Sequence, residues 1–161
     1  MMTLCSEAGF PALQSLLHLY GLTVTRVEPG TPIPGSFWGE PEAGLVGNQL
    51  YLRDDTPVHS ALHEACHYIC MDNQRRTGLD TNAGGDYEEE NAVCYLQILL
   101  AAHLPPLNPA RLMADMDSWG YSFRLGSAQA WFQQDADDAR QWLIQAGLIN
   151  DAGGPTWQVR T

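Results

Sequence analysis

The chain has 161 residues, 45% of them hydrophobic, a length and composition that suit a single core of ordinary density. Its 19 acidic and 8 basic side chains give a formal net charge of −11 at pH 7, with no local group of Lys or Arg to offset it. Such a charge repels phosphate backbones and anionic lipids, so nucleic acid and membrane surfaces are poor candidates for partners. We therefore expect one domain over residues 1–161.

The sequence also favours a reducing compartment. Its first twenty residues lack the basic region and the cleavage site of a signal peptide, and no apolar run reaches the roughly 18 residues of a membrane span. Four cysteines are too few and too irregularly spaced for the disulfide framework of a secreted domain. Most of them fall in apolar helical segments, where thiols pack as small hydrophobic groups. These features predict a cytoplasmic protein.

The first third of the chain predicts a short helix followed by a small, turn-rich sheet. An amphipathic stretch at 11–20 ends at Gly21, a residue that suits the position after a helix. Alternating β-branched residues at 22–27 predict a strand. Further short strands are expected at 36–38, 45–46 and 49–53.

Two long helices should form the middle of the chain. Thr56 can cap the free N–H groups of the first helix, which is expected over 57–71. Asp86 is placed to cap the second, an apolar segment at 87–103 that ends before a Pro-Pro pair. Because the second helix is apolar nearly all round, we expect it in the core.

The last third predicts further helices and a loose end. Asn108 opens a helix that stops at Trp119, and a helical pattern broken near Asp135 follows. The remainder, at about 153–161, is expected to be a loose tail. Tryptophans recur in this third at roughly helical spacing and are most simply core residues: Trp119, Trp131 and Trp142.

The first long helix contains the sequence His63-Glu64-Ala-Cys-His67, an H-E-x-x-H motif. Side chains at i and i+4 lie one turn apart on the same face, so two imidazoles can bind one ion at the roughly 2.0–2.1 Å of zinc–nitrogen bonds. Glu64 is about 100° around the helix from His63, beside the metal, where it can accept a proton from water. The motif therefore predicts a zinc site and a hydrolytic reaction.

A third ligand is expected from the start of the second long helix, where Glu88, Glu89 and Glu90 stand in a row. On a helical wheel Glu90 lies near the polar Gln97, whereas Glu88 and Glu89 each join apolar residues. The wheel leaves the choice among the three open. Acidic residues in a first turn also offset the helix dipole, so a structural role is the alternative interpretation of the cluster.

With Glu89-Glu-Asn-Ala92 as a second element, the region 58–99 resembles the gluzincin metallopeptidases, in which H-E-x-x-H is followed on the next helix by a zinc-binding Glu in an E-x-x-A-like setting. It is most similar to the small ImmA/IrrE-like bacterial metallopeptidases. The resemblance implies an α+β, minimal zincin-like domain with a small N-terminal sheet packed on a zinc-binding helix pair and a helical C-terminal third. It also implies a peptidase that acts on peptide or protein, with Zn²⁺ held by His63, His67 and Glu89.

The sequence departs from the family pattern after the small residue. Val93 stands where an Asn or Asp is usual, so no partner can be assigned to orient a ligand histidine. The reaction also needs a donor for the oxyanion, and Tyr121 is our choice by residue type, with Arg124 and His103 as alternatives.

Binding of the peptide by strand addition is a further implication of the resemblance. In gluzincins an exposed edge strand usually pairs with the substrate. The extended segments around 37–38 and 50–51 are the candidates for that edge in this chain.

Two other interpretations of the motif stay open. His59 extends the i, i+4 series by one turn, although such a residue more often only packs near a site. Cys70, with Cys66 or Cys94, would instead complete a closed structural zinc site. A separate alternative is a non-catalytic metalloprotein or a partner-binding module, in which the same zinc only holds the two helices together.

Overall fold

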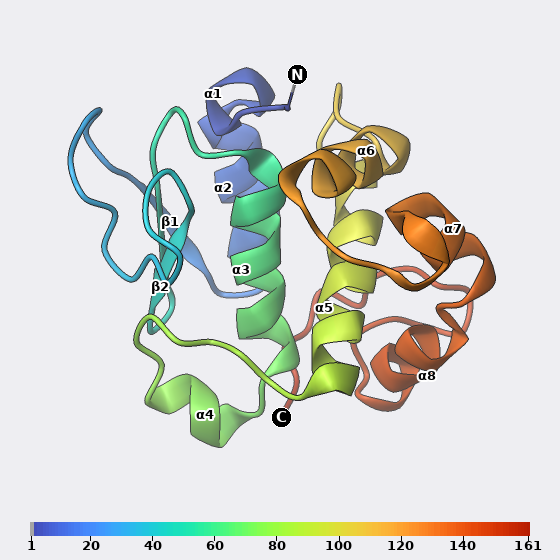
Figure 1. Cartoon of the computed structure of the whole chain (residues 1–161). Helices are drawn as coiled ribbons and strands as arrows, with labels where there is room; N and C mark the ends of the chain where they lie inside the picture. The colour runs from blue at the N-terminus through green and yellow to red at the C-terminus, as the bar shows by residue number, and fades with distance from the viewer. Residues whose placement is uncertain (1) are drawn as a thin grey trace.

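The computed structural model describes residues 2–161 and has a mixed α/β architecture. Two long helices, α3 (Val58–Cys70) and α5 (Tyr87–Leu100), lie side by side in the middle of the molecule. The strands lie on one side of this pair and the C-terminal helices on the other (Figure 1). Within residues 2–161 no helix combines the length and the apolar character that crossing a membrane requires.

Three short strands form the sheet, in the order β1 (Thr23–Arg26), β3 (Gln49–Leu52), β2 (Gly44–Val46). Strand β1 runs parallel to β3, and β2 pairs with β3 antiparallel. These strands confirm the predictions at 22–27, 45–46 and 49–53. The strand expected at 36–38 was wrong, because Gly35 (φ 74°) and Gly39 (φ 90°) adopt left-handed backbone conformations that interrupt an extended run.

The free side of β2 is already paired within the chain. The backbone N–H of Leu45 donates to the carbonyl oxygen of Gly35 at 3.2 Å, and the carbonyl of Leu45 accepts from the N–H of Thr81 at 2.9 Å. Both segments that we expected to serve as an edge for strand addition were therefore wrong. Residues 50–51 lie in the central strand, and residues 37–38 lie in no strand. Neither segment therefore offers a free strand edge.

The two long helices lie where the sequence predicts them. Asp86 caps α5 as expected, because its carboxylate accepts from the N–H of Glu89 at 2.9 Å. Thr56 does not cap α3; its hydroxyl accepts from the N–H of Arg53 at 2.9 Å and closes the preceding turn. Beyond α5 the expected helical segment continues as the 3₁₀ turn η1 (Ala101–His103).

One continuous apolar core joins the sheet, α3 and α5 to the outer helices. All four cysteines are buried and free within it, which agrees with their expected use in packing. Asn108 caps the helix that follows it, and the helical pattern breaks at Asp135, both as predicted. The surrounding elements are α1 (Cys5–Ala8), α2 (Phe10–His18), α4 (Asn73–Thr77), α6 (Pro109–Trp119), η2 (Arg124–Gly126), α7 (Ala128–Gln134) and α8 (Asp137–Gln145).

The segment at 153–161 is not the loose tail that we expected. Trp157 packs against Tyr20 with 5.7 Å between the ring centroids, and apolar burial of this kind outweighs the Gly-Gly-Pro turn before it. The N–H of Arg160 donates to the carbonyl oxygen of Ile69 at 2.9 Å, and its guanidinium lies 3.2 Å from the carboxylate of Glu89. The C-terminus therefore ties the end of α3 to the first turn of α5.

Candidate metal centre

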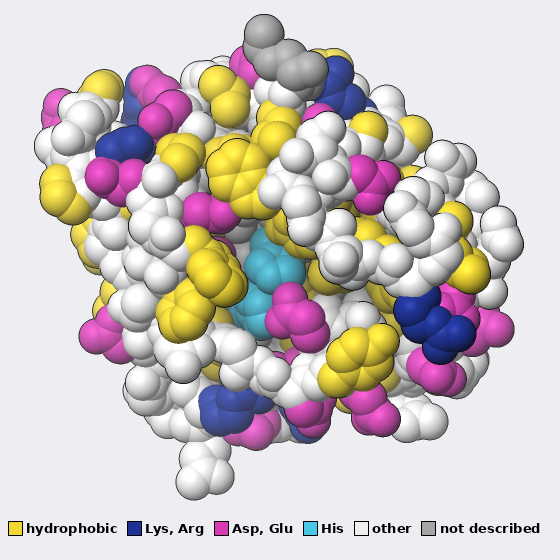
Figure 2. Space-filling model, viewed as in Figure 1, with side chains coloured by type: hydrophobic (Ala, Val, Ile, Leu, Met, Phe, Trp, Pro, Cys, Tyr) yellow, Lys and Arg dark blue, Asp and Glu magenta, His cyan; other side chains and the backbone are white. Residues whose placement is uncertain are grey.

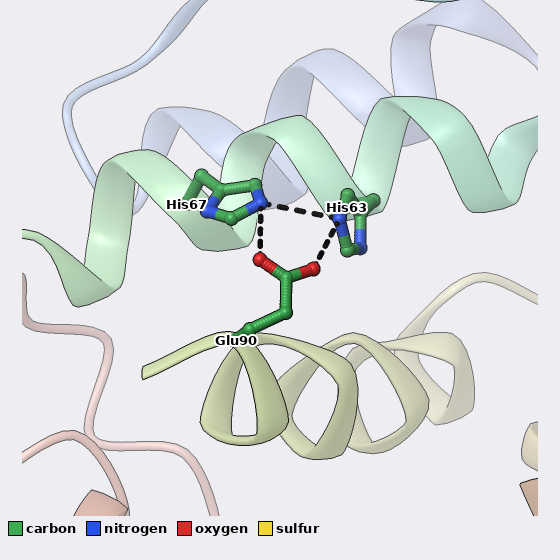
Figure 3. A group of neighbouring side chains, drawn as sticks. All are labelled: His63, His67 and Glu90. Atoms are coloured by element: carbon green, nitrogen blue, oxygen red, sulfur yellow. Dashed lines mark hydrogen bonds and ion pairs between the residues drawn. The ribbon is translucent and has the colours of Figure 1, made fainter. Parts of the chain in front are cut away.

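Two imidazoles from α3 and one carboxylate from α5 point toward one another (Figure 3). The Nε2 atoms of His63 and His67 are 3.1 Å apart. The two oxygens of Glu90 lie 3.0 Å from Nε2 of His63 and 3.2 Å from Nε2 of His67. The edge of a tetrahedron with bonds of 2.0–2.1 Å is about 3.3 Å, so these separations suit one coordination sphere. Among residues 2–161 these three are the group of ligand side chains that could hold a metal ion.

The electrostatics of this group favour a positive charge at its centre. Burial lowers the pKa of His63, but Tyr121, Cys94 and Glu90 act against it, and the pKa is raised well above its ordinary value. Burial alone would raise the pKa of Glu90, but hydrogen bonds from both imidazoles hold that pKa well below its ordinary value. Either a proton or a metal ion satisfies lone pairs that face one another at about 3 Å.

Gln97 fixes the orientation of His63. Its side chain is fully buried, and its amide nitrogen donates to the backbone carbonyl of His59 at 2.7 Å. A carbonyl can only accept, so the amide oxygen must face Nδ1 of His63, which lies 2.9 Å away and donates to it. The lone pair of His63 is thereby directed from Nε2 into the group.

This orienting residue is the one that the sequence left unassigned. Val93, at the position where the resemblance led us to expect an Asn or Asp, is buried in the core. Gln97 supplies the same kind of hydrogen bond from one turn further along α5. The sequence signal was the spacing of seven residues between Glu90 and Gln97, which puts two polar side chains on one stripe of an otherwise apolar helix.

Glu89, our choice for the third ligand, faces another part of the molecule. Its buried carboxylate accepts from both terminal nitrogens of Arg75, at 2.8 and 3.0 Å, and from Arg160 at 3.2 Å. Consecutive helix residues are about 100° apart, so only one of the three glutamates can point at α3. The geometry corrects the choice to Glu90, which the helical wheel had placed on the polar side, and leaves Glu88 exposed on the surface.

Glu64 lies beside the group, and its carboxylate accepts no hydrogen bond from residues 2–161. Its side chain is only 7% exposed. Burial raises its pKa, the two imidazoles lower it, and the nearby carboxylates of Glu42 and Glu90 raise it, so that the net shift is upward. A buried carboxylate with these properties is available to take a proton from a molecule bound in front of it.

The group lies in a hollow that is open to solvent. Figure 2 shows the histidine surface near the middle of this face, beside an acidic side chain and between hydrophobic ones. Two cavities, of about 240 and 210 Å³, meet there and share Trp38, His63, Glu64 and Glu90. A closed site would have no such access, and no thiol belongs to the ligand group in residues 2–161. The geometry therefore disfavours the Cys/His alternative.

Tyr121 reaches this cleft, but its hydroxyl lies on the far side of His63. The hydroxyl is 3.1 Å from Nδ1 of His59 and 3.4 Å from the amide nitrogen of Gln97, opposite the Nε2 atom that faces the ligand group. Burial raises the pKa of Tyr121 to about 12, so the phenol stays neutral. The hydroxyl thus has His59 and Gln97 as its partners, and the role of Tyr121 as oxyanion donor stays a prediction.

The remaining sequence candidates lie outside the ligand group. Burial, and then the charge of His63, lower the pKa of His59 to about 4, so this residue is a neutral packing partner, in keeping with the more frequent role. Arg124 forms an ion pair with Asp135, at the C-terminal end of α7, at 3.1 Å. His103 packs edge-on against Trp157, with 4.9 Å between the ring centroids.

Two tryptophans form an aromatic rim of the cleft that the sequence did not predict. Trp119 was expected in the core, but it is 40% exposed and its indole N–H donates to Glu42 at 2.8 Å. The only signal was its place at the last residue of a helix, next to Gly120, where a side chain can turn outward. Trp38, in the segment expected to be a strand, forms the other side of the rim.

Comparisons with known proteins add no family to these observations: a scan against protein-family models, a search of curated proteins and a search of solved structures each gave no match.

Proposed function

We propose that the chain is a zinc-dependent hydrolase of the peptidase class, with zinc held by His63, His67 and Glu90 and with Glu64 as the general base. The observation that carries this proposal is the convergence of three ligand side chains, at 3.0–3.2 Å, beside a buried carboxylate without a partner. Two imidazoles and one carboxylate are a donor set of catalytic zinc sites, which keep a fourth position open.

A zinc ion bound there would polarise a carbonyl group and lower the pKa of water. Glu64 then takes a proton from the water molecule while the water oxygen forms a bond to the carbonyl carbon of the peptide. As the C–N bond breaks, this proton passes from Glu64 to the amide nitrogen. The products are a carboxylic acid and an amine, and Glu64 returns to its carboxylate form.

The shape of the cleft supports a peptide as the substrate. Beyond the residues that they share, the two cavities have different walls. One is bounded by Thr81 and the 82–84 segment, the other by Trp119 and Tyr121. A bond positioned at the shared residues would have one side chain in each cavity. A small molecule with a single binding point needs only one of them.

A purely structural metal is the competing function, because the same three side chains would link α3 to α5. Structural zinc sites are closed and four-coordinate, whereas this group opens into a cleft with a free carboxylate beside it. The open cleft is the observation that favours the enzyme.

Removal of the metal tests this proposal. Zinc-loaded protein is expected to cleave members of a mixture of peptides of known sequence, with the products identified by mass spectrometry. Cleavage should stop when a chelator removes the ion and return when one equivalent of zinc is added, because the open coordination position and the activated water depend on it. Cleavage that persists without metal contradicts the proposal, and so does a protein that holds one zinc and cleaves nothing.

Gln97→Met tests the orientation of His63 independently of hydrolysis. We expect the affinity for zinc to fall roughly 10–100-fold, because His63 loses the acceptor that fixes its tautomer and ring angle. Competition with a chromophoric chelator measures the affinity, and the melting temperature of the metal-free protein reports on the fold. Gln141→Met, on the exposed surface of α8, is the matched control and should leave zinc binding unchanged. An unchanged affinity in the Gln97 variant would show that the hydrogen bond is unimportant.

A further inference from the structure

The smaller of the two cavities has aromatic walls and an acidic base. Trp38, Trp119 and Tyr121 line it together with Glu42 and the ligand group. The indole side chains are accessible, since Trp38 is 75% and Trp119 40% exposed. At about 210 Å³ the cavity is smaller than the roughly 300–1,000 Å³ of sites that hold whole small molecules. Its size suits one long side chain.

Glu42 is held in this cavity by neutral groups only. One carboxylate oxygen accepts from the indole N–H of Trp119 at 2.8 Å, and the other accepts from the hydroxyl of Ser60. Ser60 lies on α3, and its oxygen is itself held in place because it accepts from the backbone N–H of Ala43 at 2.9 Å. An ionised carboxylate has about four acceptor sites, so roughly two stay free. Glu42 thus presents a negative charge and open acceptor sites in a fixed position.

The cations of the chain lie elsewhere. All 8 basic residues are arginines, and none of them lines either cavity. Arg76 and Arg140 donate to backbone carbonyls. The hollow in Figure 2 correspondingly shows no Lys or Arg surface beside the histidines. The remaining arginines form ion pairs with carboxylates outside the cleft: Arg26, Arg53, Arg75, Arg111, Arg124 and Arg160.

We propose that this cavity binds a cationic side chain of the peptide substrate, arginine in preference to lysine, next to the bond that is hydrolysed. A planar guanidinium stacks on indole rings and donates two parallel hydrogen bonds to a carboxylate, which an ammonium cannot do. Glu42 then determines specificity, and Trp38 and Trp119 hold the plane of the guanidinium. This inference rests on the proposed function, because the cavity adjoins the reacting bond only if the ligand group carries the reaction.

Binding can be tested without any hydrolysis. The zinc-loaded Glu64→Gln protein is titrated with acetyl-arginine amide and with acetyl-citrulline amide, which has nearly the same shape and no charge. The indole N–H signals of Trp38 and Trp119, assigned with Trp→Phe variants, report the site in ¹H–¹⁵N spectra. We expect the arginine probe to shift both signals and to bind at least about tenfold more tightly than citrulline. Equal binding of the two probes overturns the proposal.

Glu42→Gln supplies the matched variant, because the amide oxygen of glutamine can still accept from Trp119 and its NH2 group can donate to the oxygen of Ser60, while the charge is removed. It should weaken binding of the arginine probe by about tenfold and leave citrulline binding unchanged. Glu40→Gln removes a charge from the same loop, where Glu40 pairs with Arg53 outside the cavity, and should have no effect. An arginine affinity that survives Glu42→Gln with an unchanged melting temperature overturns the role of Glu42.

Peptidase activity and the binding of arginine can each be absent without the other. If the arginine probe binds as described but no peptide is cleaved, the peptidase fails, and with it the role of the cavity in choosing a substrate. If peptides are cleaved without an arginine at a fixed place beside the cleaved bond, the assignment of this cavity fails and the peptidase stands.

Discussion

Glu90→Gln is expected to lower the affinity for zinc by more than about 100-fold, beyond the 10–100-fold that loss of an outer-shell partner typically costs. Glutamine has nearly the same shape as glutamate, but it lacks the negative charge that holds a divalent ion between two neutral imidazoles. Competition with a chelator, together with metal analysis of the purified variant, measures the effect. Peptide cleavage should disappear in parallel, since the site loses its ion.

Glu89→Gln is the matched control, one residue earlier on the same helix. It should leave the affinity for zinc within a few-fold of the wild type, because Glu89 faces Arg75 and Arg160. It should instead lower the free energy of unfolding by about 2–4 kcal/mol, since it breaks a buried ion pair whose arginines stay partly solvated. Chemical denaturation of the metal-free protein measures this loss. The opposite pattern, with zinc lost in the Glu89 variant and kept in the Glu90 variant, would restore the choice made from the sequence motif.

Glu64→Gln is expected to lower kcat for peptide cleavage by about 10²–10⁴, the usual contribution of a positioned general base. The amide cannot accept the proton of the attacking water, whereas the zinc ligands are untouched. Zinc content and melting temperature should therefore match those of the wild type, and the loss should fall on kcat more than on KM.

Glu88→Gln is the control for this variant, because Glu88 is exposed on α5 and lies outside both cavities at the ligand group. It should keep full activity. Unchanged activity in the Glu64 variant would contradict a role as base. Loss of zinc from that variant would instead point to a structural role of Glu64 in the site.

The parts of the structure that local rules determine could be predicted from the sequence. The i, i+4 spacing within a helix brings His63 and His67 together, and Asp86 caps the next helix because its short side chain reaches the free N–H groups. The strand predicted at 22–27 followed from β-branched alternation in the same way. Each of these features depends on residues that are close neighbours in the sequence.

The parts that were wrong depend on partners distant in the sequence. Which glutamate faces α3 is set by the rotation of α5, and that rotation places Glu89 where Arg160, from the end of the chain, can reach it. The tail was expected to be loose because its burial against Tyr20 has no local signal. Trp119 is partly exposed, and its indole N–H donates to Glu42, 77 residues away in the sequence. For the rotation of α5, the polar pair of Glu90 and Gln97 was the one local sign in the sequence.

The proposed hydrolase depends on one zinc ion that two imidazoles and the carboxylate of Glu90 share, with one position left to solvent. X-ray absorption at the zinc edge, on protein loaded with one equivalent, tests it most directly. We predict a first shell of nitrogen and oxygen only, at about 2.0–2.1 Å, with two imidazoles and an identical spectrum for Glu89→Gln. A sulfur atom at about 2.3 Å, or a shell without two imidazoles, would contradict this site and the hydrolase built on it.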